Sequence, residues 1–171
     1  MKQAEIHLIT GGQRSGKSAY AERLALENCK RPIYLATSKV WDEEYKKRIM
    51  LHQEGRSEAW INKEELLNIS QVTFPSKVVL LDCITLWLTN VFDAYKYDSQ
   101  QAKKFALSEL KRLFEQHLTL FIVSAELGMG IIPMQASTRQ FVDLHGEVNQ
   151  YIAKQAKQLS FMVAGIPLQV K

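Results

Sequence analysis

Residues 11–18 read Gly-Gly-Gln-Arg-Ser-Gly-Lys-Ser and match the phosphate-binding pattern G-x-x-x-x-G-K-[ST]. Its glycines let the backbone curl so that successive N–H groups point at phosphates, and the following helix adds its positive dipole end. Lys17 is expected to reach the β- and γ-phosphates, and the Ser18 hydroxyl to coordinate a bridging Mg²⁺. We therefore predict phosphoryl chemistry on a nucleoside triphosphate. The predicted binding residues are Gly11, Gly12, Gln13, Arg14, Ser15, Gly16, Lys17 and Ser18.

The flanking sequence favours this interpretation. Residues 6–10 form a short apolar run with the β-branched content of a buried strand, and residues 19–28 are typical of a helix. Gly-Lys-Ser triplets also arise by chance in loops, but a strand before and a helix after are the context that a phosphate loop requires.

A second element that is typical of nucleotide-binding proteins lies further along the chain. Residues 78–82, Val-Val-Leu-Leu-Asp, predict a buried strand that ends in a carboxylate. Asp82 is expected to contact the Mg²⁺ directly or through water. This pattern is weak alone, and together with the phosphate loop it favours a nucleoside-triphosphate site.

Residues 33–36 predict another apolar strand, which ends at Thr37 and Ser38. Two strands joined by a helix make a right-handed parallel βαβ unit, and ligands collect at the carboxyl ends of such strands. Thr37 and Ser38 are therefore expected beside the nucleotide. The alternative, a hydroxyl cap on the next helix, is equally compatible with the sequence and does not exclude contact.

Residues 42–54 predict a helix with acids at its start and bases further along. Arg48 and His52 are four residues apart and share a face, and Arg56 follows just beyond the end. Nearby guanidinium groups disfavour the imidazolium and keep a nitrogen lone pair available, which suits nucleophilic attack on phosphorus. The alternative is a histidine on a solvated basic helix.

The rest of the chain predicts the supporting elements of an α/β domain. These are a strand or loop at 60–61, a helix at 63–70, an apolar helix or turn at 84–92, a surface loop or lid at 93–98, a helix at 99–117, a strand at 118–123, a glycine-bearing loop at 124–130, a helix at 137–159 broken or kinked near Gly146, and a strand pair at 161–164 and 168–170.

Composition sets the class of protein. The 171 residues, 46% hydrophobic and 23% charged, fit a single domain spanning 1–171. The net charge of +4 is dispersed, without a basic run, so no nucleic-acid partner is expected. Neither a membrane span nor a signal-peptide layout is visible, which predicts a cytoplasmic protein. Cys29 and Cys83 are predicted to be reduced, small apolar side chains.

Several motifs in combination resemble one family, the bifunctional adenosylcobinamide kinase / adenosylcobinamide-phosphate guanylyltransferases of cobalamin biosynthesis. The resemblance covers almost the whole chain. It rests on residues 10–18, 34–38, Arg48-Ile49 with His52 and Gly55-Arg56, 81–85, 126–133 and Asn149-Gln150.

The resemblance implies a RecA-like P-loop NTPase fold, with a mostly parallel sheet flanked by helices, and a homotrimer. It also implies two reactions. ATP or GTP first phosphorylates the aminopropanol hydroxyl of adenosylcobinamide, a corrinoid. GTP then donates GMP to that phosphate through a guanylylated histidine, which gives adenosylcobinamide-GDP. A phosphoramidate intermediate fits the residues, because it divides a displacement between two anions into two easier steps.

The family pattern also implies individual site residues. The guanylylated histidine falls on His52. Gln53, Glu54, Gly55, Arg56, Glu64 and Asp82 would contact the guanine nucleotide, and Thr37, Ser38 and Lys39 would line its site. Four positions depart from the pattern, namely Leu51, Ala125, Val142 and Lys157. These bear on the corrinoid fit and the kinase half and leave the phosphate site intact.

Two other functions are also compatible with the sequence. One is a RecA-like ATPase or nucleotide-dependent switch, in which His52 is merely solvated. The other is a small-molecule kinase that forms no histidine adduct.

Overall fold

The computed structural model describes residues 3–39 and 58–171. Within these ranges seven strands form one sheet in the order β3-β2-β4-β5-β1-β6-β7. The strands are β1 (Glu5–Gly11), β2 (Ile33–Ala36), β3 (Ile61–Glu64), β4 (Val78–Asp82), β5 (Thr119–Ala125), β6 (Gln158–Val163) and β7 (Ile166–Gln169). The helices are α1 (Lys17–Asn28), α3 (Ile84–Ala94), α4 (Ser99–Phe114), α5 (Ala136–Gln155) and the 3₁₀ helix η1 (Ile69–Gln71).

The strands β1 to β6 all pair in parallel, and only β7 runs antiparallel, against β6. Their carboxyl ends therefore lie along one edge of the sheet. The register places Gly11 opposite Ala125 and Asp82 opposite Val123, while Ala36 lies between Glu64 and Asp82. Residues far apart in the sequence thus meet at this edge. This arrangement confirms the predicted α/β fold class, including the antiparallel pair at the C-terminus.

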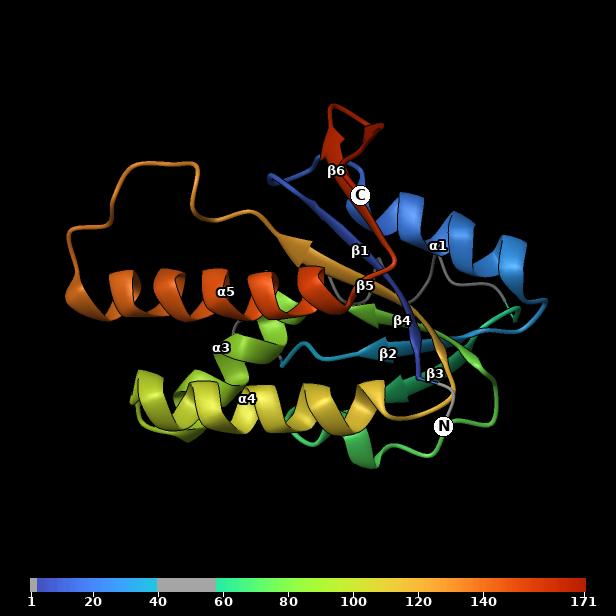
Figure 1. Cartoon of the computed structure of the whole chain (residues 1–171), viewed down its shortest axis with the longest axis horizontal. Helices are drawn as coiled ribbons and strands as arrows, with labels where there is room; N and C mark the ends of the chain where they lie inside the picture. The colour runs from blue at the N-terminus through green and yellow to red at the C-terminus, as the bar shows by residue number, and fades with distance from the viewer. Residues whose placement is uncertain (1–2, 40–57) are drawn as a thin grey trace.

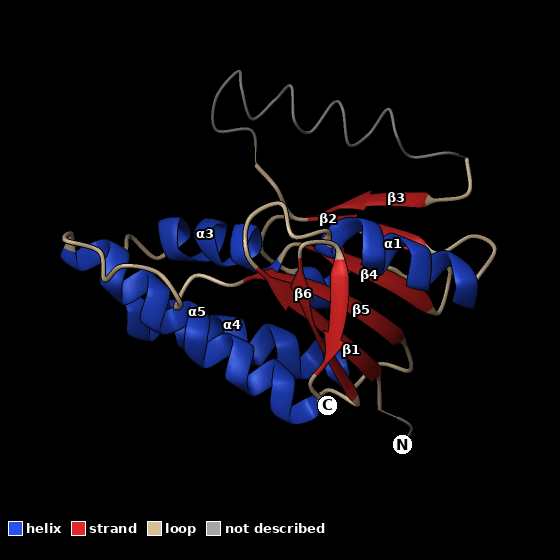
Figure 2. Ribbon diagram, turned by 90° about the horizontal axis from the view of Figure 1, so that it is seen from above, coloured by secondary structure: helices blue, strands red, loops and turns tan. Residues whose placement is uncertain are grey.

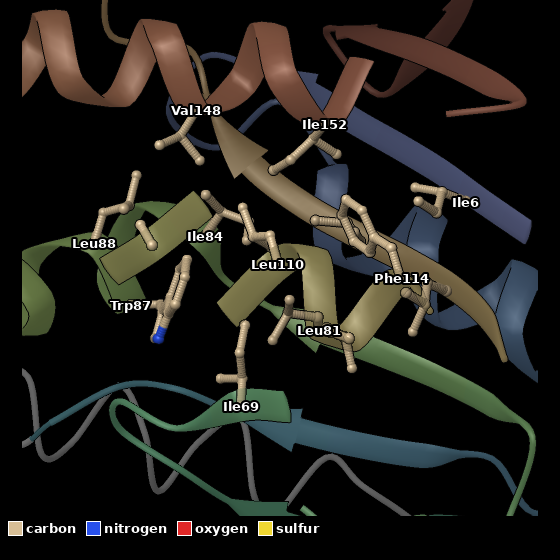
Figure 3. Close-up of a cluster of buried hydrophobic side chains, with 14 of the residues drawn as sticks. Ile6, Ile69, Leu81, Ile84, Trp87, Leu88, Leu110, Phe114, Val148 and Ile152 are labelled. Atoms are coloured by element: carbon tan, nitrogen blue, oxygen red, sulfur yellow. The ribbon is translucent and has the colours of Figure 1, made fainter. Parts of the chain in front are cut away.

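Helices cover both faces of the sheet, as Figures 1 and 2 show: α1 lies on one face, and α3, α4 and α5 lie on the other. Alternation along β1 supplies both layers, because Ile9 packs with Ala21 and Ala25 of α1 while Leu8 belongs to the opposite core. The larger core joins Trp87 of α3, Leu110 of α4 and side chains of α5 to the sheet (Figure 3).

The C-terminal hairpin of β6 and β7 supports the start of the chain. Strand β6 pairs with β1, and at the hairpin turn the Gly165 N–H donates to the Ser15 carbonyl at 3.0 Å. The phosphate loop is thus held from the side by the last strands of the protein.

Most predicted elements are present. Strands at 33–36 and 78–82 have the predicted bounds, and the region 84–92 is resolved as a helix that extends to Ala94. The predicted helix at 99–117 ends earlier, at Phe114, and the strand predicted at 118–123 begins at Thr119 and runs to Ala125. The helix predicted at 42–54 lies outside the described residues.

The prediction of a helix at 63–70 is wrong. Residues Ile61–Glu64 form β3, which pairs with β2, and a single 3₁₀ turn follows at Ile69–Gln71. Glu65, one of the two acids that favoured a helix start, has a different role. Its carboxylate accepts the backbone N–H groups of Leu67 and Asn68, both at 2.9 Å. Local propensity is overridden here by pairing at the sheet edge.

The predicted break near Gly146 is also wrong. Helix α5 runs unbroken through Gly146, since Leu144, Val148 and Ile152 bury one continuous face against the core. It ends at Gln155 rather than 159, because Leu159 instead lies on β6 opposite Leu8. Tertiary packing outweighs the weak helix propensity of one glycine.

Gly146→Ala is expected to stabilise the fold by about 0.5–1 kcal/mol. A Cβ at this position would meet no atom within 4 Å, so the helix gains propensity without a clash. Urea unfolding followed by circular dichroism measures the change. Gly16→Ala is the contrasting control, because Gly16 has φ +91° and its Cβ would approach the Gly165 Cα at 3.2 Å. A destabilised Gly146→Ala protein would contradict the description of α5.

Candidate nucleotide-binding site

The phosphate loop adopts the backbone that its glycines permit. Gly11 has φ +147°, and a Cβ there would lie 2.6 Å from the Met162 carbonyl oxygen. Gly16, with φ +91°, precedes the first turn of α1, which has no side-chain cap. The N–H groups of that turn are therefore available to an anion at the positive end of the helix dipole.

The Lys17 side chain folds back over the phosphate loop. Its Nζ donates to the Gly12 carbonyl at 2.5 Å and lies 3.4 Å from Ser15 Oγ. Partial burial lowers the pKa of Lys17, and the nearby Cys83 and Asp82 oppose that shift. The ammonium group therefore lies over the loop. Phosphate oxygens of a bound nucleotide would take the place of the Gly12 carbonyl as its hydrogen-bond acceptor.

The two predicted metal ligands lie together. Ser18 Oγ donates to Asp82 Oδ1 at 3.5 Å, although 64 residues separate them in the sequence. The Tyr34 hydroxyl donates to Asp82 Oδ2. A hydroxyl and a carboxylate are the oxygen ligands that Mg²⁺ takes beside substrate phosphates and water. No cluster of three or more His, Cys, Asp or Glu able to hold a metal occurs among the described residues.

Thr37 is buried and positions the end of β4. Its Oγ1 lies 3.2 Å from the Asp82 carbonyl and 2.9 Å from the Cys83 carbonyl, and it accepts the Cys83 N–H at 3.0 Å. The Thr37 carbonyl in turn accepts Nδ2 of Asn90 at 2.7 Å. Thr37 therefore orients the chain that carries Asp82, a role that sequence spacing did not indicate.

Ser38, Lys39 and Glu64 lie at the same edge of the sheet. Ser38 and Lys39 continue from β2, and Lys39 Nζ lies 3.8 Å from Asp93 Oδ2. Glu64 ends β3 and pairs with Ala36, whose other neighbour is Asp82. The fold thus brings these predicted residues to the side of the nucleotide site, while His52, Gln53, Glu54, Gly55 and Arg56 lie outside the described residues.

The cysteines fit the sequence interpretation. Both are free, and burial raises the pKa of the Cys83 thiol. A protonated thiol is a poor nucleophile, which agrees with a structural role for this residue beside Asp82.

Beside the phosphate loop lies a polar network that centres on His145 of α5. Its Nε2 is 2.9 Å from Thr85 Oγ1 and 3.2 Å from Ser124 Oγ, and Ser124 Oγ donates to Asn149 Oδ1 at 2.8 Å. Burial lowers the pKa of His145 to about 4, against a smaller opposing effect of the Glu126 carboxylate. The imidazole is therefore neutral near pH 7. Sequence reasoning missed His145 itself and identified only motifs around it, at 81–85, 126–133 and Asn149-Gln150.

A phosphate loop at the carboxyl end of β1, with a serine and an aspartate placed for a metal ion, defines a P-loop nucleotide-binding protein. One strand, β5, separates the loop strand from the strand that carries Asp82. Among the described residues no helix is both long and apolar enough to cross a membrane.

Comparison with known proteins specifies the class. The family described as cobinamide kinase / cobinamide phosphate guanyltransferase matches residues 7–170. The chain belongs to this family, and its mostly parallel sheet flanked by helices, with a phosphate loop after β1, agrees with the P-loop fold that the family resemblance implied. It is 34% identical to the bifunctional adenosylcobalamin biosynthesis protein CobU of Escherichia coli, over 96% of this chain and 98% of that protein. It is 36% identical to the corresponding protein CobP of Pseudomonas aeruginosa, over 96% of both chains.

Among solved structures, the chain is similar to the RadB recombinase, with a TM-score of 0.48 and 16% identity. That alignment covers 92% of this chain and 73% of the recombinase.

We expect stability to fall as the pH is lowered from about 6.5 to about 4, because the unfolded state binds a proton that buried His145 resists. The loss from this group is roughly 3 kcal/mol. Burial also lowers the pKa of His7, which acts in the same direction. Urea unfolding at a series of pH values measures how steeply the free energy of unfolding changes with pH. His145→Gln should flatten this slope, whereas His117→Gln, at an exposed position, should not; equal slopes in all three proteins would contradict this assignment.

Proposed function

We propose that this protein phosphorylates adenosylcobinamide with ATP or GTP and then transfers GMP from GTP to adenosylcobinamide phosphate. The observation that carries the proposal is the meeting of Lys17, Ser18 and Asp82 at one edge of the sheet in a chain of this family. Both reactions need the same cradle for a triphosphate, and they differ in which phosphorus is attacked.

In the first reaction the acceptor oxygen attacks the γ-phosphorus, and the bond to the β-phosphate oxygen breaks. The loop N–H groups and Lys17 hold the phosphates and balance the charge that develops on them. Ser18 and Asp82 would hold a Mg²⁺ ion, which neutralises charge on the same phosphates when bound.

In the second reaction a His52 nitrogen attacks the α-phosphorus of GTP and pyrophosphate leaves. A phosphate oxygen of the acceptor then attacks the same phosphorus, and the phosphorus–nitrogen bond breaks, which frees the histidine. Arg48 and Arg56 would stabilise the anionic groups during both steps.

The remaining nucleotide contacts are proposals of the same kind. Residues 11–16 would surround the phosphates, as the open backbone of the loop supports. Thr37, Ser38, Lys39, Gln53, Glu54, Gly55, Arg56, Glu64 and Asp82 would complete the guanine nucleotide site. Of these, the described members lie at the carboxyl edge beside Asp82.

The assembly follows from the family resemblance. We propose a single-domain chain, spanning 1–171, that acts in the cytoplasm as a homotrimer. Large apolar side chains are exposed on the loop after β5 and on β7, including Ile131 and Ile166, and they offer surface for such contacts.

Incubation with α-labelled GTP and Mg²⁺ is expected to label the protein through an acid-labile, alkali-stable bond. His52→Ala should abolish the label, because the nucleophilic nitrogen is lost. His117→Ala is the matched control, since this exposed histidine precedes β5 at the opposite edge of the sheet. Wild-type protein that hydrolyses triphosphate without labelling would favour a nucleotide switch. Phosphorylation of an alcohol without labelling would favour a simple kinase.

Lys17→Ala is expected to weaken GTP binding roughly 10- to 100-fold, because a charged hydrogen bond to the phosphates is lost. Isothermal titration calorimetry measures the dissociation constant. Lys30→Ala serves as the control, because Lys30 is exposed just beyond the far end of α1. Equal affinity of the Lys17 variant and wild type would contradict the placement of the phosphates.

A further inference from the structure

Glu126 lies at the carboxyl edge of the sheet, next to the phosphate loop. It follows β5 directly, and β5 lies between the strand of the phosphate loop and the strand of Asp82. The Glu126 backbone N–H donates to the Gly11 carbonyl at 2.8 Å, so this residue is fixed to the first glycine of the loop. A group that approaches the γ-phosphate over the end of β5 would therefore meet Glu126.

A hollow of about 260 Å³ opens beside Glu126, between α5 and the strands β1 and β6. Its lining includes Thr10, Glu126, His145, Gly146, Asn149 and Gln150. Thr10 and Glu126 connect the hollow to the phosphate loop, while the side chains from α5 form its far wall. The hollow combines apolar surface with a few hydroxyl, amide and carboxylate groups, which is typical of a small-molecule site.

Hydrogen bonds within the protein hold the polar side chains of α5 that line the hollow. Thr85 Oγ1 accepts the Ala125 N–H at 3.0 Å and lies beside His145 Nε2, and Ser124 holds the Asn149 amide. These bonds join the start of α3, the end of β5 and the middle of α5. The wall is therefore pre-organised, with neutral groups suited to an alcohol or amide.

Glu126 keeps acceptor capacity toward the hollow. Its Oε1 accepts the Gly128 N–H at 2.7 Å, which orients the carboxylate, and no described residue donates to Oε2. An oriented carboxylate with one open oxygen is the group needed to accept a proton from a bound hydroxyl.

We propose that this hollow binds the alcohol-bearing arm of the acceptor in the kinase reaction and that Glu126 is the general base. The proposal rests on the kinase half of the proposed function. The acceptor O–H proton passes to the Glu126 carboxylate while the oxygen forms its bond to the γ-phosphorus. The bond between that phosphorus and the β-phosphate oxygen breaks, and the nucleoside diphosphate leaves. Glu126 then releases the proton to solvent.

Gly146 supports the assignment of the hollow to a ligand. It lies in the middle of α5, where glycine disfavours a helix, and the space that its Cβ would enter holds no protein atom within 4 Å. The missing side chain leaves room in the wall of the hollow. Gly146→Ala narrows this space while favouring the folded state.

The test separates the two half-reactions in the purified full-length protein. Phosphorylation of adenosylcobinamide by ATP gives kcat and KM for the acceptor, and labelling by α-labelled GTP reports the histidine adduct. Glu126→Gln is expected to lower kcat of the kinase reaction roughly 100-fold or more. This loss should exceed any loss of labelling by at least about 30-fold. Glu126→Asp should recover part of the rate, because a shorter base remains.

Two further variants complete the experiment. Gly146→Leu fills the hollow and should raise KM for the acceptor roughly tenfold or more, with KM for ATP changed less than threefold. Glu147→Gln, on the same helix but paired with Lys103 at 2.9 Å, is the matched control.

The outcomes are distinguishable. Kinase activity of Glu126→Gln within threefold of wild type would overturn the role of Glu126, and an unchanged acceptor KM in Gly146→Leu would overturn the assignment of the hollow. If wild-type protein binds nucleotide but phosphorylates no corrinoid, the proposed kinase function itself fails, and this inference with it.

Discussion

Parallel pairing of β1 with β5, and of β5 with β4, is the constraint on which the site depends. It sets the loop strand and the Asp82 strand two strand spacings apart, about 10 Å, with Asp82 opposite Val123 and Gly11, the end of β1, opposite Ala125 two residues further on. Helix α1 then projects Ser18 toward Asp82 across this gap. A shift of one residue in the pairing of β4 would turn the Asp82 side chain to the other face of the sheet and separate the two ligands.

That register is maintained by burial on both faces. Ile9 and Leu80 pack under α1, while Leu8 and Leu81 pack under the helices of the opposite face. Because alternate residues along each strand belong to different cores, a slipped strand would lose apolar contacts on both sides at once. The same alternation places Asp82 with Leu80, toward α1 and Tyr34. The chemistry at the edge is thus a consequence of the packing beneath it.

The sequence predicted the parts of the site that local pattern determines. The phosphate loop is contiguous, and its glycines, lysine and serine have roles fixed by the backbone of one turn. Asp82 was identifiable because four apolar residues precede it. The position of Glu64 at the end of a strand could not be read locally, since Glu64 and Glu65 together favour a helix start and only the pairing of β3 with β2 decides the outcome.

The polar network of His145 illustrates a different limit. Asn149 lies four residues after His145 on the same helix, but Thr85 and Ser124 come from α3 and β5, which only the tertiary fold brings to it, so no spacing rule could find these two partners. The unbroken path of α5 through Gly146 has the same origin, because it depends on the core that Leu144 and Val148 enter. For the surroundings of His145, the sequence showed only family motifs, to which no individual role could be assigned.

In the proposed kinase reaction, the two faces of the sheet would hold different substrates. Helix α1 and the triphosphate cradle lie on the face of Ile9, whereas the hollow lined by Thr10 and Glu126 lies on the face of Leu8. In a phosphoryl transfer the attacking and leaving oxygens stand on opposite sides of the phosphorus, roughly in line. A donor held over one face and an acceptor entering from the other satisfy that requirement at the end of β1 and β5. On the proposed function the edge of the sheet would therefore separate the substrates and align them, with Glu126 between the two sides.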